Sequence, residues 1–554
     1  MQSSATTPPA SAAQALSPVR LIGRFLESPV SLLLAIVLAF FLNSHVLPLS
    51  DVDEGAFTEA TREMLARGNL VSPTLNDQPR HDKPILIYWA QAASVSLLGP
   101  SEFAYRLPSL LASLLWLLAL YRFCLRHGDR PTALVATLVM ALSLQVGIIA
   151  KAAIADALLN LFIALALFWI YDFFQASRHA NGAAESRRLL LAVYAALGLG
   201  FLTKGPVAVI FPLLISGLFF VSAGAWRSWL RAVCHVPGWL LFLLIVVPWH
   251  VMVYLDQGDA FFRGFYLQHN LNRYADTFEG HGGNPLYYLA VLPLVLLPFT
   301  GWLSAIAGSV MRNLRRPAGE DALLERFLAI WFAVVFLFFS FSATQLPHYL
   351  LYGCTPLFIV LARRRQDAEC RWLAFLPVIL LALLLAVLPG ILDFAGGQVR
   401  RPLETLLLQG LAAAFDDWTR WLLPLLFPAA IGLAMWRRLP VWQGLLVAGL
   451  VQAAVMSGIV LPRVLDVTQG PVREAAVLAR QQAGTVVAWR LNQPSFSVYR
   501  QAVTPSRLPV SGELVLTRAD RLAELQRELA PLAVSEIHRR GFITLARVAP
   551  KELP

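Results

Sequence analysis

Two short strings near the start of the chain are dense in charged side chains, in a sequence where only 14% of residues are charged. One string is acidic, and the other holds both acidic and basic residues. The first is DVDEGAF at 51–57 and the second is RHDKPILIYW at 80–89, both shortly after the first long apolar run. Carboxylates beside a lysine at a bilayer surface are suited to chemistry on a charged lipid. The strings therefore predict a site at a membrane surface, held in place by the helices around them.

Those helices are predicted from hydropathy. Apolar residues make up 57% of the 554 residues, and apolar runs of about 20 residues, enough to cross a bilayer as a helix, recur along the chain. We expect a mainly α, polytopic membrane protein with about thirteen spans. The predicted spans are 29–49, 104–123, 131–150, 154–175, 189–203, 206–223, 232–254, 286–308, 325–342, 347–362, 371–391, 420–436 and 439–461.

Two further stretches are predicted as helices that lie in the membrane interface. Residues 56–70 alternate apolar and charged side chains at helical spacing, which is typical of a helix lying flat at the surface. Residues 84–98 are similar in character but too short to span. Together they would frame a cavity at the outer membrane surface.

Basic residues in the short connections predict the orientation, because Lys and Arg are retained in the cytoplasm during insertion. Such connections lie at 20–24, 122–130, 187–188, 227–231, 312–316, 363–365 and 437–438. They alternate with outward-facing segments at 50–103, 151–156, 256–285, 342–347, 393–419 and after 461, and Lys204 faces the same outer side. The net charge of +11 thus reflects topology, and we expect no nucleic-acid partner.

The chain is expected to divide into three parts. Residues 1–28, rich in Ser, Ala and Pro, predict a disordered cytoplasmic lead that is not removed. Residues 29–461 form the transmembrane domain. Residues 462–554 predict a small α/β domain on the outer side, with strands at 485–491, 512–518 and 546–549 and a helix at 519–530. This domain carries no catalytic string, and we expect the protein to be a monomer.

Several motifs, taken in order, resemble one family. They are VDEGAFTEATREMLARGNLVSPTL, RHDKPILIYW, LTKGPVAVIFP at 202–212, FYLQHNLNRY at 265–274 and LPHYLLYGCTPL at 346–357. The chain is similar to the bacterial lipid-linked aminoarabinose transferases, which belong with the protein O-mannosyltransferases to the GT-C glycosyltransferases. The resemblance implies transfer of 4-amino-4-deoxy-L-arabinose from undecaprenyl phosphate to a lipid A phosphate, at the periplasmic face of the bacterial inner membrane. This modification of lipopolysaccharide gives resistance to polymyxin and other cationic peptides.

That reaction needs cations at the donor. The sugar leaves behind a phosphate monoester, so the site must neutralise charge that grows on the bridging oxygen. Lys83 in the KP motif is the first candidate for the donor phosphate, with Arg273 as its partner because a guanidinium can hold two phosphate oxygens. Lys204 in TKGP would add to the positive field. The alternatives are helix-end anchors for the lysines and a solvated loop charge for Arg273.

Three acidic residues are the catalytic candidates. Asp53 matches the loop acid of the superfamily and has Glu54 beside it. It would orient the acceptor or take its proton, although an anionic phosphate acceptor hardly needs a base. Asp156 faces the same side at the start of a span, where a carboxylate is costly unless it is used or paired. The structural alternatives are a helix cap for Asp53 and a salt bridge from Asp156 to Lys151 or Lys204.

Aromatic and imidazole side chains complete the predicted substrate site. Tyr349 would line the path of the isoprenoid tail, Tyr88 lies at headgroup depth, and His269 belongs to the FYLQHNLNRY string. An interfacial aromatic belt is the alternative for the two tyrosines. We expect no cofactor to be required. A zinc ion is the alternative for a set of outward-facing ligands whose spacing predicts no closed site, namely His81, Asp82, His269, His281 and His348.

Two other functions stay open, and two positions depart from the family pattern. A protein O-mannosyltransferase-like activity would transfer the sugar to a Ser or Thr hydroxyl, which requires Asp53 as a true base. A lipid or solute transporter would place charges mid-span in two related halves, but the charges here cluster at one face.

Ala56 and Gln345 stand where many relatives carry an arginine and a lysine, which implies different acceptor or sugar contacts.

Overall fold

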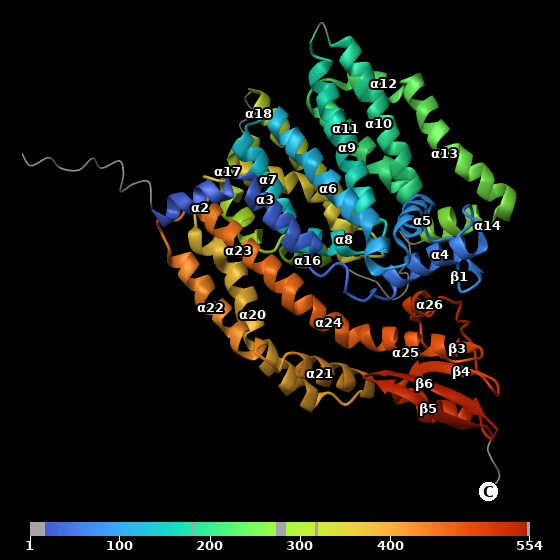
Figure 1. The fold of residues 1–554 in the computed structure, drawn as a ribbon. Helices are drawn as coiled ribbons and strands as arrows, with labels where there is room; N and C mark the ends of the chain where they lie inside the picture. Colours follow the sequence, from blue (N-terminus) through green and yellow to red (C-terminus); the bar gives the residue numbers. More distant parts are fainter. Residues whose placement is uncertain (1–16, 180–181, 273–283, 316–318, 551–554) are drawn as a thin grey trace, which may run out of the picture.

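The computed structural model describes residues 17–179, 182–272, 284–315 and 319–550, with the backbone alone described at 268–272, 313–315 and 320. It consists of a bundle of helices and a small sheet-containing unit at the C-terminal end (Figure 1). The sheet lies against α25 (Gly470–Gln481), at the end of the bundle where α4 (Asp53–Arg67) and α5 (Leu86–Leu98) are found. This end of the bundle carries both charged strings.

Within the described residues, seven helices are long and apolar enough to cross a membrane. They are α6 (Glu102–Arg126), α9 (Asp156–Ala176), α10 (Ala183–Lys204), α13 (Val236–Gln257), α18 (Gly319–Ser340), α20 (Arg371–Gln398) and the continuous helix formed by α23 (Val441–Val455), η4 (Met456–Val460) and α24 (Leu461–Thr468). On α13 the mean hydropathy is 2.0 and only 28% of the apolar window is buried. Such an exposed apolar surface is suited to lipid contact.

Four pairs of helices bend by more than 40° and bring the total to eleven if each pair is one span. They are α2 (Pro18–Leu26) with α3 (Pro29–Ile36) and η1 (Val37–Phe41), α7 (Arg130–Leu142) with α8 (Leu144–Lys151), α16 (Tyr287–Val295) with α17 (Thr300–Arg315), and α21 (Pro402–Ala414) with α22 (Thr419–Met435). The polytopic α-helical fold is confirmed.

The remaining two predicted spans coincide with shorter elements. One is α11 (Val207–Ser222), and the other combines the 3₁₀ segment η3 (Pro347–Gly353) with α19 (Thr355–Arg363). Neither is among the helices and bent pairs that reach the length and hydropathy of a span, so the count of thirteen stays a prediction. Between α11 and α16 lie α12 (Trp226–Val233), α14 (Ala260–Phe262) and the π-helical η2 (Arg263–Asn272).

Both predicted interfacial stretches are helical, but α4 is not a surface helix with one wet face. It begins at Asp53, ends at Gly68 in the left-handed conformation, and buries most of its length, including the acidic side chains of Glu54, Glu59 and Glu63. The helix packs between α5 and α26 (Pro494–Arg500). Between α4 and α5 runs a short hairpin of β1 (Thr74–Leu75) and β2 (Gln78–Pro79). Burial on both sides makes α4 a fixed support for the residues at its start.

The C-terminal unit holds a four-stranded sheet in the order β3-β4-β6-β5. The predicted strands and helix are found as β3 (Val486–Ala488), β4 (Leu514–Arg518), β6 (Ile543–Ala549) and α27 (Leu522–Glu528). β3 and β4 are parallel, with α26 in the crossover, and β6 is antiparallel to both β4 and β5 (Ala533–Arg540). We missed β5 because this edge strand exposes polar residues and lacks a buried apolar face. The boundary at 461/462 stays a prediction, since α23 to α24 is one continuous helix.

Candidate functional site

A buried charged cluster lies where α9, α10 and η3 meet. Asp156 Oδ1 accepts hydrogen bonds from Lys204 Nζ at 2.8 Å and from the Tyr352 hydroxyl. Lys204 Nζ also donates to the Tyr352 hydroxyl at 2.8 Å, and His348 Nε2 lies 3.7 Å from the same carboxylate oxygen. The Lys204 ammonium lies over the Tyr349 ring, 5.2 Å from its centroid. The salt bridge from Asp156 to Lys204, predicted as the structural alternative, is therefore present.

Local sequence explains how these groups converge. Asp156 is the first residue of α9, and Lys204 is the last residue of α10, immediately before Gly205 with φ +75°. The 3₁₀ segment η3 places Tyr349 and Tyr352 on one side, three residues apart, which is one turn of such a helix. The cluster thus occupies helix ends, where a lysine and a carboxylate can be paired at membrane depth.

A second charged cluster is formed by the RHDKP string. Arg80 donates to the Tyr88 hydroxyl at 3.0 Å and pairs with Asp82 at 2.9 Å, and Lys83 Nζ lies 2.6 Å from the other Asp82 oxygen. The Arg80 guanidinium also lies over the Phe57 ring of α4. Lys83 is 12% exposed and Asp82 is 23% exposed. The cluster places two cations on one carboxylate, and such cations can bind an anionic ligand.

Asp53 lies close to this second cluster. Its side chain is exposed at the first position of α4, and in the part of the chain that the structure describes it makes no hydrogen bond or ion pair. Burial by itself lowers the pKa of Arg80, but neighbouring groups that include Asp53 raise it above its usual value. Among the described residues the Asp53 carboxylate is therefore an unengaged group within electrostatic reach of Arg80, in the cluster that also holds Lys83, and it is available to a ligand that approaches from outside.

The two clusters lie on either side of η2. A Cβ on Gly264 would lie 2.6 Å from the Cβ of His81, and a Cβ on Gly205 would lie 2.6 Å from the ring of Phe265. Glycine at both positions lets η2 pack directly against the RHDKP string and against the end of α10. The predicted residues His269 and Arg273 follow along this segment, but the His269 side chain and Arg273 lie outside the described residues.

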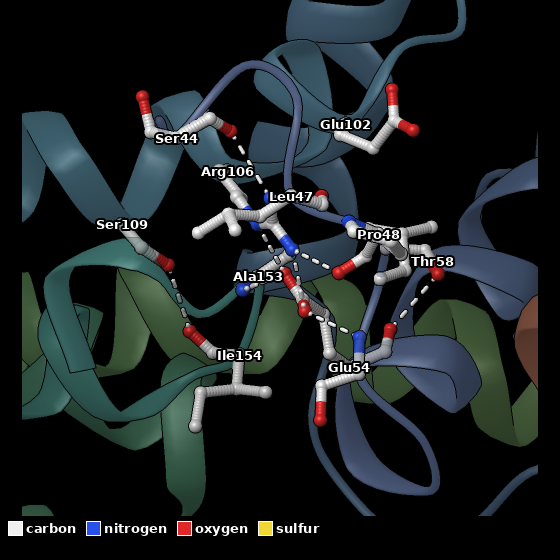
Figure 2. A network of polar contacts seen from close by, with 12 residues as sticks. Ser44, Leu47, Pro48, Glu54, Thr58, Glu102, Arg106, Ser109, Ala153 and Ile154 are labelled. Atoms are coloured by element: carbon white, nitrogen blue, oxygen red, sulfur yellow. Dashed lines mark hydrogen bonds and ion pairs between the residues drawn. The ribbon is translucent and has the colours of Figure 1, made fainter. Parts of the chain in front are cut away.

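Glu54, predicted beside Asp53 as a catalytic acid, instead lies in a buried network (Figure 2). Its Oε1 accepts hydrogen bonds from Arg106 Nε at 2.7 Å and from the backbone N–H of Ala153 at 3.0 Å. Its Oε2 accepts from Arg106 Nη2 at 2.9 Å and from the backbone N–H of Ser50 at 2.8 Å. Both oxygens are engaged within the protein, and this geometry supports a structural role rather than a catalytic one.

Arg106 completes that network. Beyond Glu54, its guanidinium donates to the backbone carbonyls of Ser44, Leu47 and Pro48 (Figure 2). Every N–H of the guanidinium has an acceptor, as a buried charge requires. Through Ala153 the network also holds the segment that leads into Asp156. It therefore fixes the start of α4, which carries Asp53, relative to the start of α9.

The predicted aromatic residues divide between two roles. The Tyr88 side chain is fully buried, stacks on Phe57 and accepts its hydrogen bond from Arg80, so it supports the cation instead of lining an open path. Tyr349 is partly exposed beside the Lys204 cluster. Sequence reasoning missed Arg80 and Tyr352, although both lie in strings that the family resemblance uses. Their position in RHDKP and LPHYLLYG was the available signal.

The zinc alternative and the departure at Gln345 can be compared with the geometry. Among the described residues no three His, Cys, Asp or Glu side chains gather as a metal site. His281 and the His269 side chain lie outside that description, so zinc binding stays a prediction.

Gln345 is buried, and its Nε2 donates to the carbonyls of Phe339 and Ser340 at the end of α18. Gln345, which stands where many relatives carry a lysine, therefore caps the C-terminal end of α18.

Comparisons with known proteins agree with the predicted family. The dolichyl-phosphate-mannose-protein mannosyltransferase family matches residues 82–252, which begin at Asp82 and include Lys83, Asp156 and Lys204. A protein of Aquifex aeolicus, described only as an uncharacterized protein, is 30% identical over 322 residues, covering 58% of this chain and 69% of the relative. An undecaprenyl phosphate-α-4-amino-4-deoxy-L-arabinose arabinosyl transferase of Pseudomonas fluorescens is 27% identical over 492 residues, covering 84% and 85%.

The fold also matches a solved structure along almost its full length. The crystal structure of ArnT from Cupriavidus metallidurans bound to undecaprenyl phosphate superposes with a TM-score of 0.75 at 19% identity. The match covers 96% of this chain and 98% of that one, so the C-terminal unit is part of the shared fold. The chain therefore belongs to the family of GT-C membrane glycosyltransferases that contains the undecaprenyl phosphate-aminoarabinose arabinosyl transferases.

Proposed function

We propose that this glycosyltransferase moves 4-amino-4-deoxy-L-arabinose from undecaprenyl phosphate to a phosphate group of lipid A. The observation that carries the proposal is the juxtaposition of Arg80 and Lys83 with the unengaged carboxylate of Asp53. A donor phosphate needs cations, and an amino sugar that is protonated at neutral pH is complementary to a carboxylate. The name of the arabinosyl transferase relatives supports the same donor, and the resemblance to that family supports lipid A as the acceptor.

In this proposal the acceptor phosphate oxygen attacks the anomeric carbon of the sugar. The bond between that carbon and the bridging oxygen of the donor breaks, and undecaprenyl phosphate leaves with the bonding electrons. Lys83, supported by Arg80 and assisted by Arg273, neutralises the charge that grows on the leaving phosphate. No proton has to be removed from the acceptor, since its phosphate is already anionic near neutral pH. Asp53 then holds the sugar in place.

The Asp156 cluster has a separate part in the proposal. Lys204 is already neutralised by Asp156, so it adds less positive charge than a lone lysine would. Its ammonium and the Tyr352 hydroxyl are held in fixed positions by one carboxylate oxygen. We assign to this cluster the task of presenting hydrogen-bond donors to the donor lipid beside η2, with Tyr349 against the isoprenoid.

The proposal includes an orientation. The N-terminus and the arginine-rich connections are cytoplasmic, and residues 50–103 face the periplasm together with the unit at 462–554. The family resemblance and the arrangement of basic loops support this topology. Lipid A then reaches the site from the outer leaflet of the inner membrane, and a monomer carries every group that the reaction uses.

Mass spectrometry of lipid A tests the function directly. Cells that make the donor would be compared with and without the full chain, and an aminopentose added to lipid A is the expected result. No change in mass in cells that express the protein in the membrane would refute the proposal. Mass spectrometry of periplasmic proteins from the same cells tests the second candidate, transfer of the sugar to a Ser or Thr hydroxyl. The match to the mannosyltransferase family favours this candidate.

A further inference from the structure

A lysine that the proposed reaction does not use is buried at the end of α8. Lys151 is 5% exposed, and within the described residues its ammonium has a single hydrogen-bond partner, the hydroxyl of Ser457 in η4. No carboxylate described by the structure pairs with it. The charged neighbour that acts on it is Arg106, which is also a cation. An ammonium in this position is costly unless an anion accompanies it.

A cavity of about 260 Å³ adjoins this ammonium. Most of its walls are apolar, but it also contains the Gln452 side chain, whose Oε1 is buried without a hydrogen-bond partner among the described residues. Ile148 lies on its outer side and is 42% exposed. The lining comes from η1, from the end of α7 with α8, and from the continuous helix of α23, η4 and α24. The cavity therefore combines a cationic end with a hydrocarbon-like wall.

The backbone around the cavity is unusual in a second respect. Two π-helical segments, η1 and η4, both contribute to its lining, and the Asn43 amide donates to the carbonyl of Ser457 at 2.9 Å. π-helical turns are rare and are frequently found at functional sites. Ser457 of η4 is held at both of its polar groups, since its carbonyl accepts from Asn43, two residues after η1, and its hydroxyl accepts from Lys151. The arrangement fixes the ammonium at the edge of the cavity.

We propose that this cavity binds one anionic phospholipid of the surrounding bilayer, with its phosphate on the Lys151 ammonium and part of an acyl chain along the apolar wall. Charge complementarity selects the headgroup, because no carboxylate among the described residues pairs with Lys151. The apolar lining selects a lipid over a free anion. Since Lys151 lies two residues before Ala153, which Glu54 holds, the bound lipid would also support the segment that leads to Asp156. The inference does not depend on which sugar or acceptor the enzyme uses.

The test uses the purified full chain in detergent, titrated with phosphatidylglycerol or phosphatidylcholine of matched acyl chains and followed by native mass spectrometry. Wild type should retain one phosphatidylglycerol at about tenfold lower lipid concentration than phosphatidylcholine, the size of one charge-assisted contact. Lys151→Met should reduce this preference to less than about twofold. Equal retention of both lipids by wild type, or an unchanged preference in Lys151→Met, would overturn the proposal.

A second pair of variants keeps the test decisive if Lys151→Met fails to fold. Ile148→Trp places an indole at the mouth of the cavity and leaves Lys151 intact, so it should also abolish retention of phosphatidylglycerol. Leu240→Trp puts the same ring on α13, where the leucine is 63% exposed, and should behave as wild type. Phosphatidylglycerol should raise the melting temperature of wild type and of Leu240→Trp only, whereas inorganic phosphate should raise none. Stabilisation by inorganic phosphate alone would mean an anion site without a lipid.

Discussion

The carboxylate of Asp51 accepts two hydrogen bonds from Ser495, one from the backbone N–H at 2.9 Å and one from the hydroxyl. These residues are 444 positions apart, and their contact joins the segment just before α4 to α26 of the C-terminal unit. A Cβ on Gly55 would lie 2.7 Å from the Ser495 nitrogen, so only glycine allows α4 to approach this closely. The C-terminal unit thus supports the helix that presents Asp53.

The burial of Asp51 at this contact should make stability depend on pH. Burial raises the pKa of the Asp51 carboxyl to about 7, although the hydrogen bonds from Ser495 oppose the shift. A carboxyl whose pKa is raised on folding stabilises the protein while protonated, so its contribution is lost as the pH rises from about 4 to about 7. Asp51→Asn can keep both contacts without ionising. Its melting temperature should fall less than that of wild type across this range.

Wild type and Asp51→Asn must be compared at each pH because a second buried carboxyl has the same effect on stability. Burial raises the pKa of Glu59 to about 8, so its contribution to stability is also lost as the pH rises. That contribution is common to both chains and cancels in the difference between them. If the melting temperatures of wild type and Asp51→Asn changed by the same amount from pH 4 to pH 8, the prediction would be wrong.

Glu54→Gln should destabilise the protein rather than alter its chemistry alone. The change leaves the Arg106 guanidinium buried without its counterion, and breaking such a pair typically costs about 3 to 5 kcal/mol. We expect a large drop in melting temperature and in the amount of folded protein recovered from membranes. A Glu54→Gln protein that melts like wild type and yet has lost transfer would restore the catalytic role predicted from the sequence.

Lys83→Ala should reduce transfer by about 100-fold or more, because a cation that stabilises the leaving phosphate acts mainly in the transition state. Lys83→Arg should keep part of the activity, since the charge remains. Arg401→Ala is the matched control, as this arginine is 82% exposed immediately before α21 and pairs only with Glu404 among the described residues. Initial rates with purified donor lipid would be measured for all three, and full activity of Lys83→Ala would remove Lys83 from the donor site.

Asp53→Asn distinguishes the two candidate acceptors. With a phosphate acceptor the carboxylate only positions the sugar, and the rate should fall by less than about tenfold. With a Ser or Thr hydroxyl the same residue must take a proton, and losing a general base should cost about 10² to 10⁴ in rate. A loss in the larger range, seen in kcat with KM unchanged, would favour transfer to protein.

Tyr352→Phe tests the buried cluster around Asp156. The change removes the hydroxyl that bonds both Asp156 and Lys204 but keeps the ring that packs in η3. We expect the melting temperature to change little, because Lys204 still neutralises the carboxylate, and the rate of transfer to fall about tenfold as the ammonium loses its fixed position. Wild-type rates in Tyr352→Phe would show that the hydroxyl has no part in presenting the lysine.

Much of the membrane fold could be predicted from local composition. Runs of apolar residues marked the spans from α6 to α24, and the charged strings marked the segments that carry Lys83, Asp53 and Asp156. Hydropathy is a property of neighbouring residues, so it can be read along the chain. It could not show that α4 is buried, because its mixture of acidic and apolar residues is equally typical of a surface helix.

The partners of the charged residues were decided only by tertiary structure. The sequence by itself determined that carboxylates and cations gather at one membrane face and that they match a family of glycosyltransferases. The tertiary structure decided that Glu54 pairs with Arg106, and that Asp51, which had no expected role, contacts Ser495. It also decided that Asp53, beside Glu54, has no hydrogen bond or ion pair with any residue that the structure describes. The physical reason is that a buried charge must be neutralised by whichever group the packing brings near, and that group can lie hundreds of residues away.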